Sequence, residues 1–184
     1  MEPQDLMELL VPPRAYVTRA ELFTIEGTPI AWKRALRNGN TYYTHPKQKA
    51  WQERVRFEVS RQWTLGPVDG PCLLDVIACL KRPRKHFLDQ GALRGSAPFF
   101  SVSHKCGDAD NHLKGIADAL QGVKKKGRVG TLYNDDCQIV GGSGHKVYAD
   151  GLGEELEGTG GGIPVGVIIQ FSVVDPDWGG RGAG

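Results

Sequence analysis

Apolar and polar positions along the chain repeat at distances that predict strands and helices. Residues 21–26 (ELFTIE) alternate between apolar and polar side chains, which predicts a strand with one buried face. The apolar runs 73–80 (LLDVIACL) and 165–174 (VGVIIQFSVV) predict two buried strands. A further strand is expected to begin at 137–140 and to run into 146–148.

Two segments have helical spacing. Residues 46–63 predict a basic amphipathic helix, and Pro46 suits its first turn. Residues 111–121 predict a second helix, with Asp110 as the expected N-cap and Gly122 as its expected end. Four residues give this second helix one apolar face: Leu113, Ile116, Ala117 and Leu120.

The segments between these elements are rich in Gly, Pro, Ser and basic residues, and they predict loops at 27–40, 82–105 and 124–132. Long connections in compact domains are often functional. The order of strands and helices predicts an α+β fold, with a small sheet and packed helices in one domain at 21–175. Residues 1–20 are expected to form a flexible N-terminal extension, and 176–184 a disordered tail.

The composition places the chain among globular proteins. It has 184 residues, 40% of them hydrophobic and 24% charged, which suits one domain with its own core. No apolar run is long enough to span a membrane, and the N-terminus does not resemble a signal peptide. The four cysteines show no CxxC spacing, so a reduced, cytoplasmic protein is expected, in a bacterial cell or in an infected host.

The charges are nearly balanced in number but are segregated along the chain. There are 23 basic and 21 acidic residues, for a net charge of +2. Acidic residues gather at 108–118 and 135–136, which suggests a path for a polyanion that leads to an acidic pocket. Basic residues cluster in three runs, 32–37, 81–86 and 124–128. These runs supply the candidate DNA-binding residues: Lys33, Arg34, Arg37, Lys81, Arg82, Arg84, Lys85, Lys124, Lys125, Lys126 and Arg128.

The acidic stretch has a spacing that suits phosphodiester hydrolysis. Asp110, Lys114 and Asp118 follow one another at intervals of four residues, so a helix places them on one polar stripe. Magnesium prefers carboxylate, water and substrate oxygens, and Asp108, Asp110 and Asp136 are the candidate metal ligands. Lys114 is the candidate that offers positive charge to the phosphate or to the attacking water.

Each of these residues also has an ordinary structural explanation. Asp110 could serve only as a helix cap, Lys114 and Asp118 could form a surface ion pair, and Asp135-Asp136 could be a turn. Their combination within one short segment favours the catalytic interpretation.

The same residues resemble the RusA family of Holliday junction resolvases. The ordered motif consists of 108–111 (DADN), Lys114, 118–120 (DAL) and 135–139 (DDCQI). Upstream, residues 23–56 are similar to the family's opening strand, basic loop and first helix, and residues 80–87 (LKRPRKHF) to the strand end and basic turn before its acidic motif. The resemblance covers roughly residues 21–175.

The resemblance implies a homodimer of mixed α/β fold that cleaves branched DNA, especially four-way junctions. It implies dependence on magnesium, with manganese as a substitute, metal-ligand roles for Asp108, Asp110 and Asp136, and a catalytic role for Lys114. Many members of the family come from phages and prophages, so a phage origin is plausible. Two features depart from the family: the loop between Gly122 and Asp135 is longer, and His112 stands where an apolar residue is expected.

Three alternatives remain open at the level of sequence. The chain could bind branched DNA without cutting it and hold only a structural ion, or it could cut flaps and forks. It could also be a zinc module, although the residues available for this lack a recognised zinc spacing: His104, Cys106, His112 and Cys137. The dimer interface is expected to involve an apolar strand near a shared sheet edge, either 165–174 or 73–80.

Overall fold

The computed structural model describes residues 17–38, 41–121, 131–149 and 164–175. The strands are β1 (Val17–Glu26), β2 (Leu36–Asn38), β3 (Thr41–Tyr43), β4 (Cys72–Leu80), β5 (Ile139–Tyr148) and β6 (Gly166–Val174). The α-helices are α2 (Pro46–Gln62) and α3 (Ala109–Leu120). Three short 3-10 turns complete the described elements: η2 (Arg84–His86), η3 (His104–Cys106) and η5 (Asp136–Gln138).

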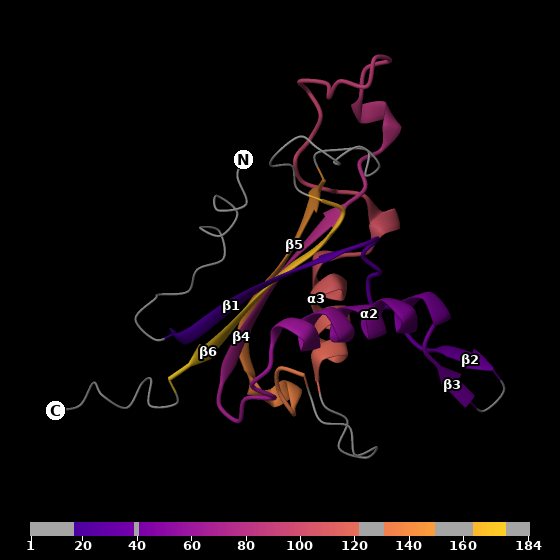
Figure 1. Cartoon of the computed structure of the whole chain (residues 1–184). Helices are drawn as coiled ribbons and strands as arrows, with labels where there is room; N and C mark the ends of the chain where they lie inside the picture. The colour runs from indigo at the N-terminus through magenta and orange to yellow at the C-terminus, as the bar shows by residue number, and fades with distance from the viewer. Residues whose placement is uncertain (1–16, 39–40, 122–130, 150–163, 176–184) are drawn as a thin grey trace.

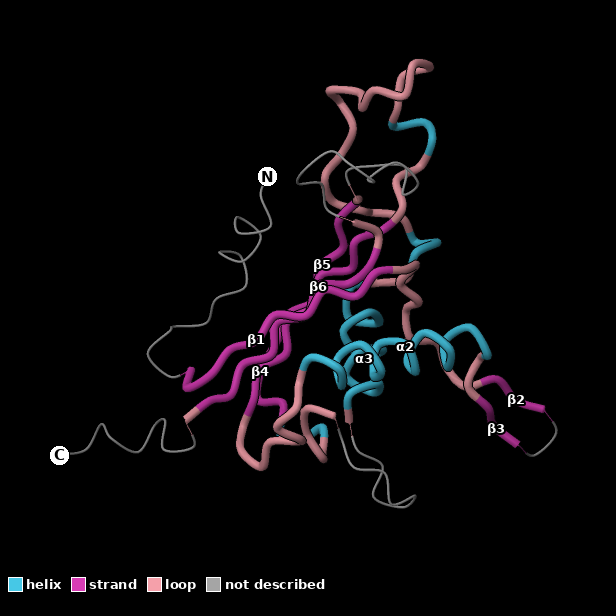
Figure 2. The backbone as a smooth tube through the Cα atoms, viewed as in Figure 1, coloured by secondary structure: helices cyan, strands magenta, loops and turns pink. Residues whose placement is uncertain are grey.

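The main sheet has the order β1-β6-β4-β5, and both long helices lie against one of its faces (Figure 1, Figure 2). The β1/β6 and β6/β4 pairs are antiparallel, whereas β4 and β5 are parallel, so the sheet is mixed. This arrangement confirms the predicted α+β class. No helix of the described part of the chain is long and apolar enough to cross a membrane.

The core lies between the sheet and the helices because alternate residues of the strands face the same side. On β4, Leu74 and Val76 are fully buried against this side, where they join Val55 of α2 and Ile116 and Leu120 of α3 in one cluster. This packing anchors the inner face of α3 and leaves its outer face available for polar residues.

The two helices confirm the sequence prediction, with one correction at a cap. Helix α2 begins at Pro46, and His45 caps it by accepting a hydrogen bond from the Lys47 amide at 3.2 Å. Helix α3 begins at Ala109, so its N-cap is Asp108 and Asp110 lies in the first turn. The expectation that Asp110 is the N-cap is therefore wrong. The helix ends at Leu120 with Gln121 as its C-cap, two residues before the expected end at Gly122, which itself lies outside the described residues.

The strands differ from the prediction in three respects. Strand β1 begins at Val17, because residues before Glu21 also pair with β6. Residues 36–38, which fall in the predicted loop 27–40, pair with residues 41–43 as the short hairpin β2-β3. Strands β4 and β6 are the two central strands, and the sheet edges are β1 and β5. The expectation that 73–80 or 165–174 lies near a sheet edge is therefore wrong, since ladder hydrogen bonds occupy both sides of each.

The predicted long connection between β4 and α3 extends beyond the end of the sheet, at the top of Figure 1. It contains η2 and η3, and Phe100 forms an isolated bridge with Val147 that ties it back to β5. The expected loop at 124–132 lies largely outside the described residues, as do 1–16, 151–162 and 176–184.

Candidate functional site

The outer face of α3 carries the predicted polar stripe. Asp110, Lys114 and Asp118 stand one helical turn apart, and Lys114 Nζ lies 3.4 Å from a carboxylate oxygen of Asp118. Lys114 is exposed, whereas Asp118 is half-buried. The inner positions Ile116 and Leu120 pack in the core, so the sequence of α3 holds the stripe in place at the surface.

Asp136 joins this stripe at its C-terminal end. Its turn, η5, is fixed by a capping box between Asp135 and Gln138, and the Asp135 side chain also accepts from the Cys137 amide. The Gln138 amide group donates to the Val68 carbonyl at 2.7 Å and anchors the turn to the chain before β4. The negative charge of Asp136 acts on Asp118, so two carboxylates distant in sequence are brought together.

The pKa of Asp118 reflects this environment. Burial raises the pKa above its usual value, the adjacent Lys114 ammonium opposes that shift, and the charge of Asp136 adds to it. The indole N–H of Trp32 also donates to the Asp118 carboxylate and lowers its pKa. The Asp118 carboxylate therefore has Lys114 and Trp32 as hydrogen-bonding partners and is repelled by the charge of Asp136.

Trp32 is a site residue that the sequence interpretation missed. Lys114 Nζ lies 5.3 Å from the centre of the Trp32 ring, a distance at which a cation is attracted to the ring face. The Trp32 amide donates to the Asn111 carbonyl at 2.8 Å, which holds the residue beside α3. The only signal in the sequence was an aromatic residue at the start of the basic run 32–37.

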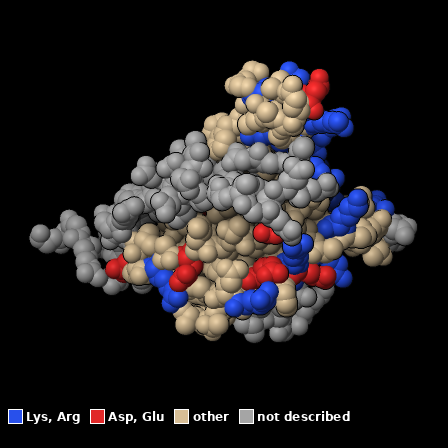
Figure 3. Space-filling model, turned by 45° about the horizontal axis from the view of Figure 1, so that its top comes forward, with Lys and Arg blue, Asp and Glu red and all other residues tan. Residues whose placement is uncertain are grey.

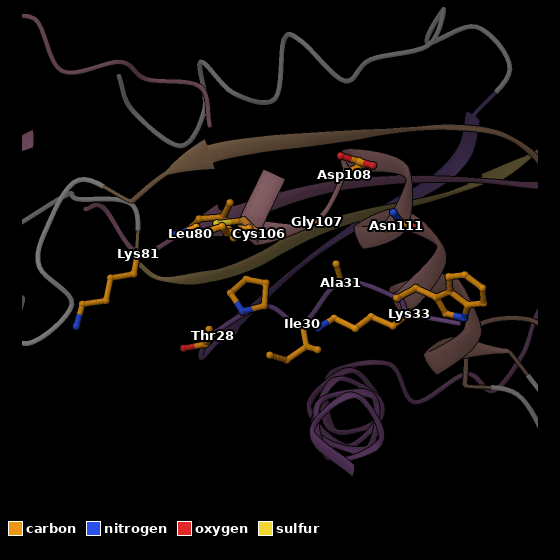
Figure 4. A pocket seen from close by; sticks show the side chains of 13 residues that line it. Thr28, Ile30, Ala31, Lys33, Leu80, Lys81, Cys106, Gly107, Asp108 and Asn111 are labelled. Atoms are coloured by element: carbon orange, nitrogen blue, oxygen red, sulfur yellow. The ribbon is translucent and has the colours of Figure 1, made fainter. Parts of the chain in front are cut away.

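The remaining predicted ligand, Asp108, lies two residues before Asp110. It occupies the N-cap of α3 without making a side-chain capping hydrogen bond, and it is exposed. It lines a pocket together with Asn111 (Figure 4). Among the described residues, no group of three His, Cys, Asp or Glu side chains is arranged to hold a metal ion. The ligand set Asp108, Asp110 and Asp136 therefore stays a prediction.

Most of the described basic candidates are exposed, as DNA contact requires. Figure 3 shows Lys and Arg side chains close to Asp and Glu side chains on one face of the molecule. The exposed candidates are Lys33, Arg34, Arg37, Lys81, Arg84 and Lys85. The candidates Lys124, Lys125, Lys126 and Arg128 lie outside the described residues.

Arg82 is the exception among the basic candidates. It is 3% exposed, its Nε donates to the Ala149 carbonyl at 3.0 Å, and its Nη1 donates to the Pro98 carbonyl at 2.7 Å. The guanidinium also lies over the ring of Tyr148. Because these groups of its own chain bind the guanidinium, Arg82 is removed from the set of candidate phosphate contacts. Its role is structural, since it holds the long connection between β4 and α3 in place.

The structure also explains His112, which departs from the family pattern. The side chain is buried, and its Nε2 lies 2.7 Å from the Cys106 carbonyl oxygen. Burial lowers its pKa, which favours the neutral imidazole. His112 thus ties α3 to η3, and this contact gives it a structural role in place of the zinc-ligand role considered above.

The fold and the site together define a small α+β protein that presents carboxylates, a lysine and basic loops on its surface, as an enzyme acting on phosphodiesters requires. Residues 26–156, most of the chain, match the family model described as Endodeoxyribonuclease RusA. The chain belongs to the RusA family of endodeoxyribonucleases, which confirms the resemblance and supports an endonuclease that acts on Holliday junctions. Comparison with curated proteins gave no significant match.

Proposed function

We propose that the chain resolves four-way DNA junctions by magnesium-dependent hydrolysis of paired phosphodiester bonds, within the cytoplasm, in DNA recombination, repair or phage DNA processing. The observation that carries this proposal is the surface network of Lys114, Asp118 and Asp136, with Asp110 one turn away on the same helix. Family membership supports the class of enzyme, an endonuclease, and this network supports the assignment of the groups that would carry out hydrolysis.

The carboxylates suit a hard divalent cation. Asp108, Asp110 and Asp136 are all exposed, and carboxylate oxygens are the protein ligands that magnesium prefers. The repulsion between Asp136 and Asp118 would be relieved by a bound cation. We therefore assign Asp108, Asp110 and Asp136 as the residues that would hold magnesium, with manganese as a substitute. When bound, magnesium would stabilise charge on the attacking and leaving oxygens.

The other residues have distinct roles in this proposal. Lys114 offers its ammonium to the scissile phosphate, and its contacts with Asp118 and Trp32 fix that charge before the substrate arrives. The exposed basic residues on 33–37 and 81–85 contact backbone phosphates, which orient the DNA without reading its bases. Asp118 is a positioning residue, because it acts through Lys114.

Homodimerisation is part of the proposal, since the described residues of each chain contain one such network and junction resolution needs two nicks. A twofold dimer presents two identical sites and matches the symmetry of a four-way junction. Wild-type protein mixed with an excess of Asp110→Asn protein should nick a cruciform plasmid on one strand and accumulate open circles. A monomeric mass at micromolar concentration, with and without DNA, would contradict the dimer.

Cleavage of matched DNA substrates tests the function itself. A four-way junction, a fork and a linear duplex of shared sequence are each incubated with magnesium, with calcium or with a chelator. We expect symmetric nicks in the junction with magnesium, binding without efficient cleavage in calcium, and no cleavage with chelator. Equal cleavage of the linear duplex, or junction binding without cleavage in any divalent cation, would contradict the proposal.

A further inference from the structure

A pocket of about 610 Å³ lies beside the N-terminus of α3. One wall is the extended segment 28–33 that follows β1, and the other walls are the end of β4, residues 105–108 and Asn111. Figure 4 shows Thr28, Ile30 and Ala31 along one side, with Leu80, Cys106 and Gly107 opposite. Asp108 is one of the lining residues, so the pocket adjoins one of the proposed metal ligands.

The charged groups of the pocket suit an anion. Lys33, Lys81 and Lys105 come from three different walls, and all three are exposed. None of these lysines forms an ion pair with another of the described residues. Among the described residues of the lining, Asp108 is the only carboxylate, so these residues carry a positive excess. Lys105 stands outside the three basic runs and was missed by the sequence interpretation.

The rest of the lining suits a flat apolar group. Pro29, Ile30, Ala31, Leu80 and Cys106 provide aliphatic and thiol surface between the lysines. Polar groups alone would be sufficient to follow a phosphate backbone. An apolar surface bordered by lysines matches a ligand that combines an aromatic base with phosphates.

The wall at residues 105–108 is fixed from beneath. Lys146 Nζ donates to the Gly107 carbonyl at 2.6 Å, and His112 Nε2 contacts the neighbouring Cys106 carbonyl at 2.7 Å. Gly107 has a φ of 80°, and a Cβ at this position would collide with the Ala31 side chain across the pocket wall. These contacts fix the position of this wall before a ligand binds.

We propose that this pocket holds one unstacked nucleotide of the bound DNA strand. Its base lies against Ile30 and Leu80, and its flanking phosphates lie among the three lysines. This inference rests on the proposed function, because the strand that places a nucleotide here also passes Asp108. Extrusion of a base is least costly where pairing is already interrupted, as at a branch point. The pocket thereby gives the enzyme a physical basis for preferring branched DNA over continuous duplex.

Binding measurements with abasic DNA test this pocket. Four-way junctions that lack a single base, at each position around the crossing in turn, are titrated with wild-type protein in calcium. Loss of the base that occupies the pocket should weaken binding about tenfold or more, as expected when the apolar surface of one base is no longer buried. The other positions should change affinity little.

Variants of pocket residues, and one control variant, are compared in the same binding measurements. Thr28→Trp fills the mouth from an exposed position, so it should weaken binding of the intact junction and make binding insensitive to the missing base. Lys105→Ala should weaken binding of every junction and reduce its salt dependence. Lys47→Ala removes an exposed lysine from α2 outside the pocket lining and is the charge control.

The outcomes distinguish failure of the pocket proposal from failure of the proposed function. If wild-type protein cuts the intact junction in magnesium but no abasic position weakens its binding, the pocket is refuted and the proposed function stands. Equal losses from Lys47→Ala and Lys105→Ala, or an undiminished abasic effect in Thr28→Trp, would also refute it. If the protein neither binds nor cuts branched DNA, both proposals fail. Tight binding of a free mononucleotide, unaffected by DNA, would assign the pocket to a small molecule instead.

Discussion

Arg82 and Lys81 are adjacent in one basic run, and the structure predicts opposite consequences for their removal. The Arg82 guanidinium is buried and donates to the Ala149 and Pro98 carbonyls at 3.0 and 2.7 Å. Lys81 is exposed and lines the pocket. We expect Arg82→Ala to reduce the free energy of unfolding and Lys81→Ala to reduce DNA affinity.

The size of the stability loss follows from these contacts. A hydrogen bond from a charged group contributes about 1.5–3 kcal/mol, and the carbonyls of Ala149 and Pro98 would lose these partners together. The substitution also removes the contact of the guanidinium with the Tyr148 ring. We therefore expect Arg82→Ala to lower the free energy of unfolding by about 3 kcal/mol, and Lys81→Ala to change it by less than about 0.5 kcal/mol.

Urea denaturation followed by tryptophan fluorescence measures this difference. With a denaturant slope of about 2 kcal/mol per molar, the midpoint of Arg82→Ala should fall by about 1.5 M, while that of Lys81→Ala should stay near wild type. Binding to a junction under native conditions is measured in parallel. Wild-type stability in Arg82→Ala, together with a loss of DNA affinity equal to that of Lys81→Ala, would refute the structural role of Arg82.

Two further predictions concern the network on α3 and a buried carboxyl. Lys114→Ala should reduce turnover about a hundredfold, with little change in junction affinity, because one preorganised charge is lost. Trp32→Phe keeps an aromatic ring for Lys114 but removes the N–H that faces Asp118, so its rate of single-turnover cleavage should fall less than that of Lys114→Ala. A normal cleavage rate in Lys114→Ala would show that this network is only a surface ion pair. Burial raises the pKa of Asp75 above 3.8, so its ionisation lowers the free energy of unfolding as the pH rises from about 3.8 through the folded pKa. Asp75→Asn, which keeps an acceptor for Ser143, should therefore resist urea better than wild type near pH 7 and match it near pH 3; a difference that grows toward low pH would contradict this sign.

The periodicity of the sequence was sufficient to predict the elements that form the core. Alternation and apolar runs located β1, β4 and β6, and the spacing of α3 separated its buried face from the stripe that carries Lys114. These predictions depend only on local repeats, which directly reflect which side of an element is buried. The short hairpin β2-β3 was missed because both its strands are only three residues long.

Contacts between distant segments could not be predicted in this way. The approach of Asp136 to Asp118 depends on how η5 is anchored, and that of Trp32 to Lys114 on how the segment after β1 crosses α3. Likewise, Arg82 is equivalent to its exposed neighbours in the run 81–86 until the position of the Ala149 and Pro98 carbonyls is known. Tertiary packing, and not composition, assigns these residues their roles.

The central claim, that the carboxylates of this surface support hydrolysis of branched DNA, is tested most directly by Asp110→Asn. Asp110 is exposed in the first turn of α3, so the substitution should leave the fold intact. Binding of a labelled four-way junction is measured in calcium, and cleavage of the same junction in magnesium. We expect Asp110→Asn to bind the junction as tightly as wild type or more tightly, because a negative charge near phosphate is removed, and to produce no detectable nicks. Cleavage by Asp110→Asn at the wild-type rate would contradict the account.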